Sequence, residues 1–210
     1  MRYLAVSTVT ICSLLMTSPA SAELSFGIGV GHASSEKIEN SDISAMLLGN
    51  RIYVAENFTQ DTSDIAFRLF SAYEFTDWLD AEIAFTDYGE NSFYGEINQM
   101  PTPTTSDFRS IDVSGTLSGF SISIAPKKKY ANGVTVNAKM GALLWNINGD
   151  GTEYFVRDGT EFYSNKLKVD DYGVDFLFGM GISYSYFTLS YERTSINSSE
   201  TDLIMFSAKF

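Results

Sequence analysis

The amino-acid sequence predicts an all-β chain folded as one eight-stranded, antiparallel, up-and-down barrel. Apolar residues recur at every second position, they gather in eight runs, and short and long connections between the runs alternate strictly. With 210 residues, 44% hydrophobic and 19% charged, the chain fits one ordered domain. No uninterrupted apolar run reaches the roughly 18 residues that a membrane-spanning helix needs.

The first 22 residues have the features of a secretory signal peptide. Arg2 supplies the positive start, residues 4–16 an apolar centre, and Ala20 and Ala22 a small-residue cleavage site. Cleavage after Ala22 would divide the chain into a signal peptide, 1–22, and one barrel domain, 23–210. The only cysteine, Cys12, would leave with the leader, so we expect a mature chain without disulfides.

The first three strands are expected at residues 24–30, 65–74 and 79–86. In the first, Leu24, Phe26 and Ile28 alternate with serine and glycine, which gives one apolar and one small-residue face. The second and third runs are separated by Thr76-Asp77, the length of a tight hairpin turn.

The remaining strands are expected at residues 108–124, 134–145, 172–184, 187–196 and 203–210. Asn132-Gly133 is the hairpin signal between the fourth and fifth strands. In the fourth strand the apolar phase changes, and a bulge near Ser118-Gly119 would reconcile its two halves.

Three short connections are therefore expected near residues 76, 130 and 185. Four long connections are expected at 34–62, 89–107, 146–170 and 196–201, the first with a short helix over residues 43–48.

An exported barrel of this kind either encloses its apolar face, as soluble lipocalin-type barrels do, or turns it toward lipid. Strand cores of about ten residues, an even strand number, and short turns opposite long loops favour the transmembrane form, with short periplasmic turns and long extracellular loops. Aromatic residues also gather near the strand ends, as at a lipid–water boundary. They are Tyr73, Phe75, Trp78, Phe120, Tyr130, Tyr184, Tyr186 and Phe187.

Four charged residues lie at one level when positions are counted upward from the short turns. They are Arg68, Glu82, Lys139 and Glu192. Two cations and two anions at mid-membrane height would be prohibitive toward lipid, but they can satisfy one another inside a narrow barrel. A shift of one residue in the last hairpin would replace Glu192 by Arg193. In a soluble barrel the same charges would lie in solvent.

Residues 72–89 and 134–145 resemble the third and fifth strands of OmpA-type outer-membrane barrels. The terminus with Ile204, Phe206, Ala208 and Phe210 is similar to the signal that bacterial barrel-assembly machinery recognises. The resemblance implies an internal ion-pair network with an acid on the third strand and a cation on the fifth, here Glu82 and Lys139. The larger members of that family continue into a periplasmic peptidoglycan-binding domain, whereas the sequence here stops at Phe210, so no cell-wall tether is expected from it.

The first functional hypothesis is a non-enzymatic barrel in the outer membrane of a Gram-negative cell envelope that displays acidic loops to the outside. Its expected partners are membrane lipid, lipopolysaccharide, an unknown extracellular ligand, and the assembly machinery and periplasmic chaperones. A net charge of −12 argues against nucleic acid. No cofactor is expected. The best candidate for a divalent-cation site is the segment Asn148-Gly149-Asp150-Gly151-Thr152-Glu153. It does not match the pattern of a calcium-binding loop, so no metal site is assigned.

Two alternatives are a porin-like small-solute channel gated by the ion-pair network and a lipid-modifying hydrolase. The hydrolase would use His32 and Ser34, with Glu36 in the same phase, although that phase faces lipid. A further question is whether the run Lys127-Lys128-Lys129 contacts lipid phosphates or is a solvated turn.

Overall fold

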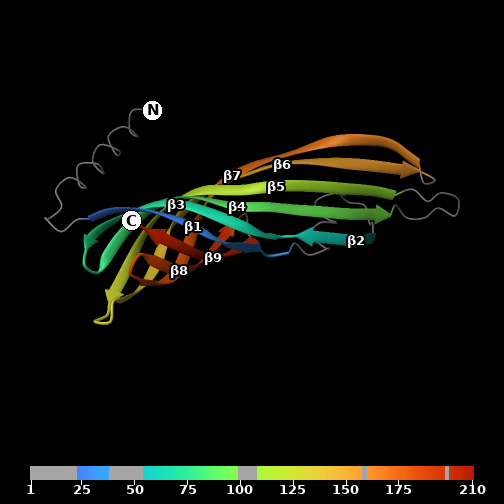
Figure 1. Cartoon of the computed structure of the whole chain (residues 1–210). Coiled ribbons are helices and arrows are strands. Elements are labelled where there is room, and N and C mark those ends of the chain that lie inside the picture. Colours follow the sequence, from blue (N-terminus) through green and yellow to red (C-terminus); the bar gives the residue numbers. More distant parts are fainter. Residues whose placement is uncertain (1–22, 38–53, 99–107, 158–159, 197–198) are drawn as a thin grey trace, which may run out of the picture.

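The computed structural model describes residues 23–37, 54–98, 108–157, 160–196 and 199–210, and they form one continuous antiparallel sheet (Figure 1). The predicted signal peptide and the short helix expected at 43–48 lie outside these residues. The strands are β1 (Glu23–Ser35), β2 (Val54–Asp61), β3 (Ser63–Thr76), β4 (Leu79–Asn98), β5 (Phe108–Lys129), β6 (Val134–Arg157), β7 (Thr160–Tyr184), β8 (Phe187–Ile196) and β9 (Ser199–Lys209).

Eight of these strands close into a ring, as predicted. The order β4-β3-β1-β9-β8-β7-β6-β5 is completed by pairing of β4 with β5, while β2 pairs only with the outer part of β4. Following paired residues once around the ring from Tyr172 leads back to β7 at Ile182, ten residues further along. A stagger of this kind tilts the strands by about 35–45° to the barrel axis.

The apolar face of the ring points outward, which excludes the soluble alternative. On β1, Leu24, Phe26 and Ile28 each keep more than half of their surface exposed, whereas Ser25 between them is 5% exposed. Exposed large apolar side chains occur on all eight ring strands and form a continuous outer belt. A belt of this extent is stable only against lipid. Among the described residues, no helix has the length and apolarity that crossing a membrane would require.

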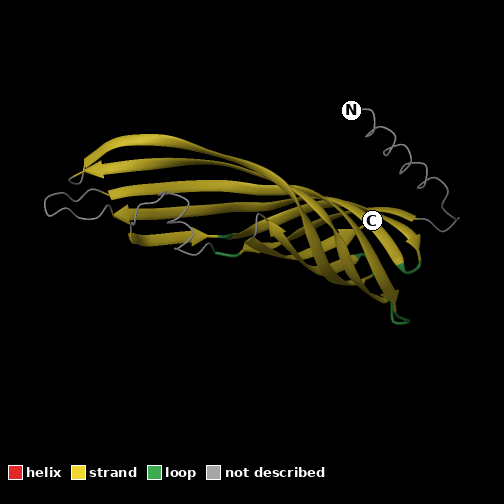
Figure 2. Ribbon diagram, turned by 180° about the vertical axis from the view of Figure 1, so that it is seen from behind, coloured by secondary structure: helices red, strands yellow, loops and turns green. Residues whose placement is uncertain are grey.

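The strands β4 to β7 run far beyond this belt, where the sequence predicted loops at 89–107 and 146–170. β6 and β7 pair in regular register from Val134↔Tyr184 to Phe155↔Tyr163, and after one register shift they pair again as far as Arg157↔Thr160. β2 adds a further strand beside β4. Figures 1 and 2 show these strands projecting as an open sheet past the ends of β1, β8 and β9. We call this part, β2 with residues 90–98, 108–116, 148–157 and 160–170, the extracellular extension.

The loop prediction failed because part of the extension is rich in residues that usually form turns. Asn148 to Gly151 contains the residues that favour turns, yet each of these positions is paired on both sides, with β5 and with β7. The pairing partners, which lie far away in the sequence, decide the structure here.

A bulge exists, but on the neighbouring strand. The register between β4 and β5 shifts between Asp87 and Glu90, opposite Leu117, while Ser118 and Gly119 stay in regular pairing with β6. Gly89 has a φ of 86°, a conformation that favours glycine. Oδ2 of Asp64 accepts a hydrogen bond from the Glu90 amide at 2.8 Å and fixes the bulge. The phase change in β5 needs no bulge, because Ile111 and Leu117 face the interior.

Candidate functional site: the barrel interior

The charged residues predicted to face the lumen come together in one cluster. Arg68 of β3 forms a two-pronged ion pair with Glu192 of β8, with 2.5 Å between Nη2 and Oε2. Nε of Arg68 donates to the Thr86 hydroxyl at 2.9 Å. Both side chains of the pair are 3% exposed, so the charge of the guanidinium is compensated by the carboxylate and not by water.

Lys139 of β6 joins the two acids of the cluster. Its Nζ lies 2.8 Å from Oε1 of Glu82 and 2.7 Å from Oε1 of Glu192. Arg193, the alternative to Glu192, faces outward and pairs with Asp202 through Nε at 2.6 Å. The registers of β3, β4, β6 and β8 therefore place all four predicted residues in one network, which we call the upper ion-pair tier.

A second tier near the periplasmic turns was not predicted. Lys127 binds Glu74 at 2.6 Å and Asp80 at 2.5 Å, and Lys129 binds Glu74 at 2.9 Å. Lys128 points the other way, with its ammonium 5.4 Å from the centre of the Tyr130 ring. Strand alternation through the lysine run was the signal that could have revealed this tier, since it turns two of the three lysines inward.

A polar cavity of about 230 Å³ lies between the two tiers. Hydroxyl and amide groups of Thr135, Asn137, Ser183 and Ser190 line it together with the charged residues of both tiers. A cavity of this size and polarity holds several water molecules. The periplasmic half of the lumen is thus hydrated and charged.

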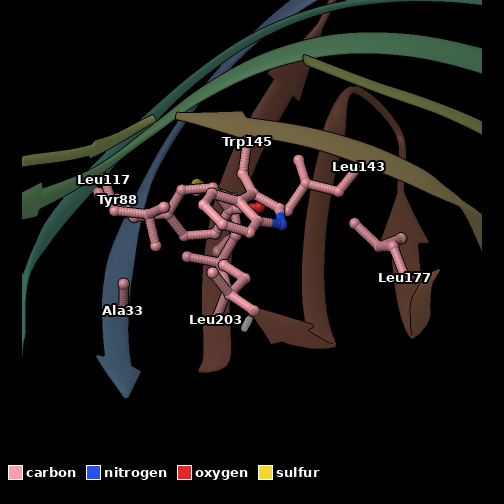
Figure 3. Packing of buried hydrophobic residues seen from close by; sticks show 10 residues of the cluster. Ala33, Tyr88, Leu117, Leu143, Trp145, Leu177 and Leu203 are labelled. Atoms are coloured by element: carbon pink, nitrogen blue, oxygen red, sulfur yellow. The ribbon is translucent and has the colours of Figure 1, made fainter. Parts of the chain in front are cut away.

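The extracellular half of the lumen is filled by apolar side chains (Figure 3). We call this group the apolar plug. It consists of Ala33, Ala66, Tyr88, Leu117, Leu143, Trp145, Leu177, Ile196, Leu203 and Met205, each at most 6% exposed. Nε1 of Trp145 donates to Oδ2 of Asp175 at 2.7 Å, which satisfies the buried indole N–H. The plug was not predicted, because each of the eight ring strands contributes only one or two of its members.

The hydrolase residues do not form a catalytic arrangement. His32, Ser34 and Glu36 are all exposed on the outward side of β1 and its continuation, the side of Leu24 and Phe26. In the part of the chain that the structure describes, no hydrogen bond joins His32 to Ser34, so the serine lacks the contact with a base that would activate it.

The candidate cation segment has the geometry of a strand. Asp150 is exposed on the outer face of β6 and Glu153 is buried on the inner face, so their carboxylates diverge. Among the described residues, no group of three or more histidine, cysteine, aspartate or glutamate side chains could hold a metal ion.

The model of one protein family, the OmpA-like transmembrane domain, matches residues 19–192. Similar solved structures include Ail of Yersinia pestis, 15% identical with a TM-score of 0.39, covering 90% of this chain and 99% of that one. The N-terminal barrel domain of Pseudomonas aeruginosa OprF is 11% identical (TM-score 0.46; 90% and 100% covered). OprG of the same organism is 14% identical (TM-score 0.45; 89% and 95% covered).

A search of curated proteins gives no match. The family match covers most of the chain and agrees with the closed ring and its outward apolar belt. The chain belongs to the OmpA-like transmembrane domain family and is an outer-membrane β-barrel.

Proposed function

We propose that the protein is a sealed, non-enzymatic barrel that holds a stiff, acidic sheet at the cell surface. The observation that carries the proposal is the long ladder between β6 and β7. It runs in regular register from the periplasmic turn to Phe155 and Tyr163 and, after one register shift, ends at Arg157 and Thr160. Because β4 to β7 form part of the barrel wall and most of the extension, continuous strands anchor the surface sheet to the barrel.

The outer face of the extension is the surface proposed to interact. It exposes Glu90, Asp112, Asp150 and Asp170, against the lysines Lys166 and Lys168. An acidic face just above the membrane suits divalent cations that bridge it to the phosphates of lipopolysaccharide. We propose lipopolysaccharide as the partner at this face and membrane lipid as the partner of the apolar belt.

Purified lipopolysaccharide tests this surface. Binding to the refolded mature chain, measured with and without Mg²⁺, is expected to require the cation. It is expected to weaken when Glu90, Asp112, Asp150 and Asp170 are replaced by the matching amides. A variant with Lys166 and Lys168 changed to glutamine is the control on the same face, and it should bind at least as well as wild type. Equal binding by the amide variant, or binding independent of Mg²⁺, would contradict the proposal.

Biogenesis is proposed to follow the usual route of such barrels, through periplasmic chaperones and the barrel-assembly machinery. On β9, Ile204 and Phe206 face lipid and are about half exposed, and the last residue, Phe210, is largely exposed. Ala208 shares this outward phase. An alternating apolar terminus of this kind stays available for recognition until the ring closes. Phe210→Ser is expected to reduce the amount of assembled barrel in the membrane, and an unchanged amount would contradict this route.

The second candidate function is a small-solute channel. It is favoured by the contact of the upper ion-pair tier with the hydrated cavity, since Lys139 could exchange between Glu82 and Glu192. If this exchange gates a pore, the Glu82→Ala variant should have a single-channel conductance that differs from that of the wild type. Identical traces from both proteins would end the channel hypothesis.

A further inference from the structure

The lumen contains two regions of different polarity, one above the other. Below lie the hydrated cavity and the ion-pair tiers, and above them lies the apolar plug. Exchange of partners within the upper tier would rearrange charges that already border water. It would leave the plug intact.

The plug is built from the whole circumference of the barrel. Each of the eight ring strands contributes at least one of its buried side chains, and β6 and β9 contribute two each. In Figure 3 the indole of Trp145 reaches across the lumen toward Tyr88 and Leu203. An apolar constriction of this kind resists ions and polar solutes, because they would have to shed their water to pass.

The position of Trp145 is built into the neighbouring strands. A Cβ at Gly173 of β7 would lie 2.5 Å from Cζ2 of the indole, so only glycine leaves room for the ring. On β5, a Cβ at Gly119 would lie 2.8 Å from Cδ1 of Leu143. The hydrogen bond to Asp175 holds the free edge of the ring. The largest side chain of the plug therefore has one defined place in the lumen.

We propose that the apolar plug, centred on Trp145, is the permeability barrier of this barrel, and that the ion pairs are not. The inference rests on the proposed function as a sealed barrel, and it names the residues that seal it. A path opened at Trp145 would lead past the upper ion-pair tier, whose charged groups line the hydrated cavity, and small hydrophilic solutes and ions would then pass to the periplasmic mouth.

Planar-bilayer recordings of the refolded mature chain test the inference. Trp145→Ala is expected to produce discrete current steps that wild type lacks, and Leu143→Ala smaller ones. Glu82→Ala is expected to stay silent. Trp78→Ala is the matched control, because it removes the same side chain from an exposed position in a periplasmic turn. The change in gel mobility on heating establishes that each variant is a folded barrel.

The outcomes separate the two proposals. Current steps from wild type would overturn the sealed barrel itself. A silent wild type together with silent, folded Trp145→Ala and Leu143→Ala variants would overturn the plug as the barrier, and so would steps from Glu82→Ala.

Discussion

The strands β4 to β7 run through both the barrel within the membrane and the extension above it, and the polarity of their two faces is reversed between these regions. Within the membrane, β6 turns Met140 and Leu144 outward and Lys139 inward. In the extension, the outer face carries Asn148 and Asp150, and the inner face of the sheet carries residues such as Ile111, which is 2% exposed. The strand continues while its environment changes. The polarity of the two faces therefore marks where the lipid ends, and the length of a strand does not.

The apolar plug lies near this boundary. Leu143 and Leu144 are neighbours on β6, one completely buried in the lumen and the other exposed to lipid. Apolar side chains thus occupy both faces of the wall at this level, in contrast to the regions below and above. Five predictions test this account, from the largest expected effect to the smallest, and the first three compare matched positions.

Glu192→Ala should have the largest effect on stability. It leaves Arg68 and Lys139 buried without their shared carboxylate, which costs about 3–5 kcal/mol. The free energy of unfolding in urea, followed by tryptophan fluorescence in lipid vesicles, measures the loss. Arg193→Ala on the same strand is the control, since its exposed ion pairs contribute at most about 1 kcal/mol. Equal losses in the two variants would contradict the network.

Leu143→Ala should cost about 2–5 kcal/mol, because it leaves a cavity in the plug. Leu144→Ala removes the same atoms from the lipid-facing side, where lipid fills the space. Its effect should be clearly smaller in the same urea experiment. A larger loss from Leu144→Ala would mean that the two faces of β6 have been assigned the wrong way round.

Gly89→Ala should destabilise the junction between barrel and extension by about 1–3 kcal/mol, since a positive φ is unfavourable for alanine. The new Cβ would also lie 2.5 Å from Cβ of Asp64. At Gly115 a Cβ would meet nothing closer than 3.5 Å, so Gly115→Ala is the control. Amide hydrogen exchange near residue 90 should increase in the first variant alone. Unchanged exchange there would argue against a structural role for the bulge.

Acid should weaken the outer pair of Arg193 and Asp202 by a small amount. The hydrogen bond from Arg193 lowers the pKa of Asp202 below its ordinary value of 3.8. Such a lowered pKa adds stability above the ordinary value, and this stability is lost as the pH falls through the folded-state pKa. The difference in unfolding free energy between wild type and Arg193→Gln should therefore shrink below about pH 4. A difference that is constant with pH would contradict the pairing.

His32→Ala should change no measured property. The histidine is exposed on the lipid-facing phase of β1, and no hydrogen bond joins it to Ser34 in the described part of the chain. Hydrolysis of a lipid ester by wild type that is lost in this variant would contradict the non-enzymatic proposal.

The sequence predicted the ring and the four residues of the upper tier because both follow from a period of two. Counting from the turns gave Arg68, Glu82, Lys139 and Glu192 the same level, and their network depends only on that level. The plug was missed because residues such as Ala33 and Ile196 carry no local pattern, and only the closed ring brings them together.

The extension was missed for the opposite reason, since its local pattern is misleading. Gly149, Asp150 and Gly151 favour a turn by themselves, and pairing with β5 and β7 overrides that preference. The bulge was predicted one strand away from its true place. The register of β4 against β5 depends on contacts such as that of Asp64 with Glu90, which the sequence alone does not show.

Cysteine labelling along β6 tests the central claim, that the barrel wall continues outside the membrane as paired strands. The mature chain expected from the sequence has no cysteine, so single substitutions from residue 142 to 153 can be labelled with a water-soluble maleimide on intact cells. The account predicts no labelling at 144, rapid labelling at 148, 150 and 152, and slow labelling at 149, 151 and 153. Uniform rapid labelling from 146 onward would show a loop in place of a strand and would contradict the account.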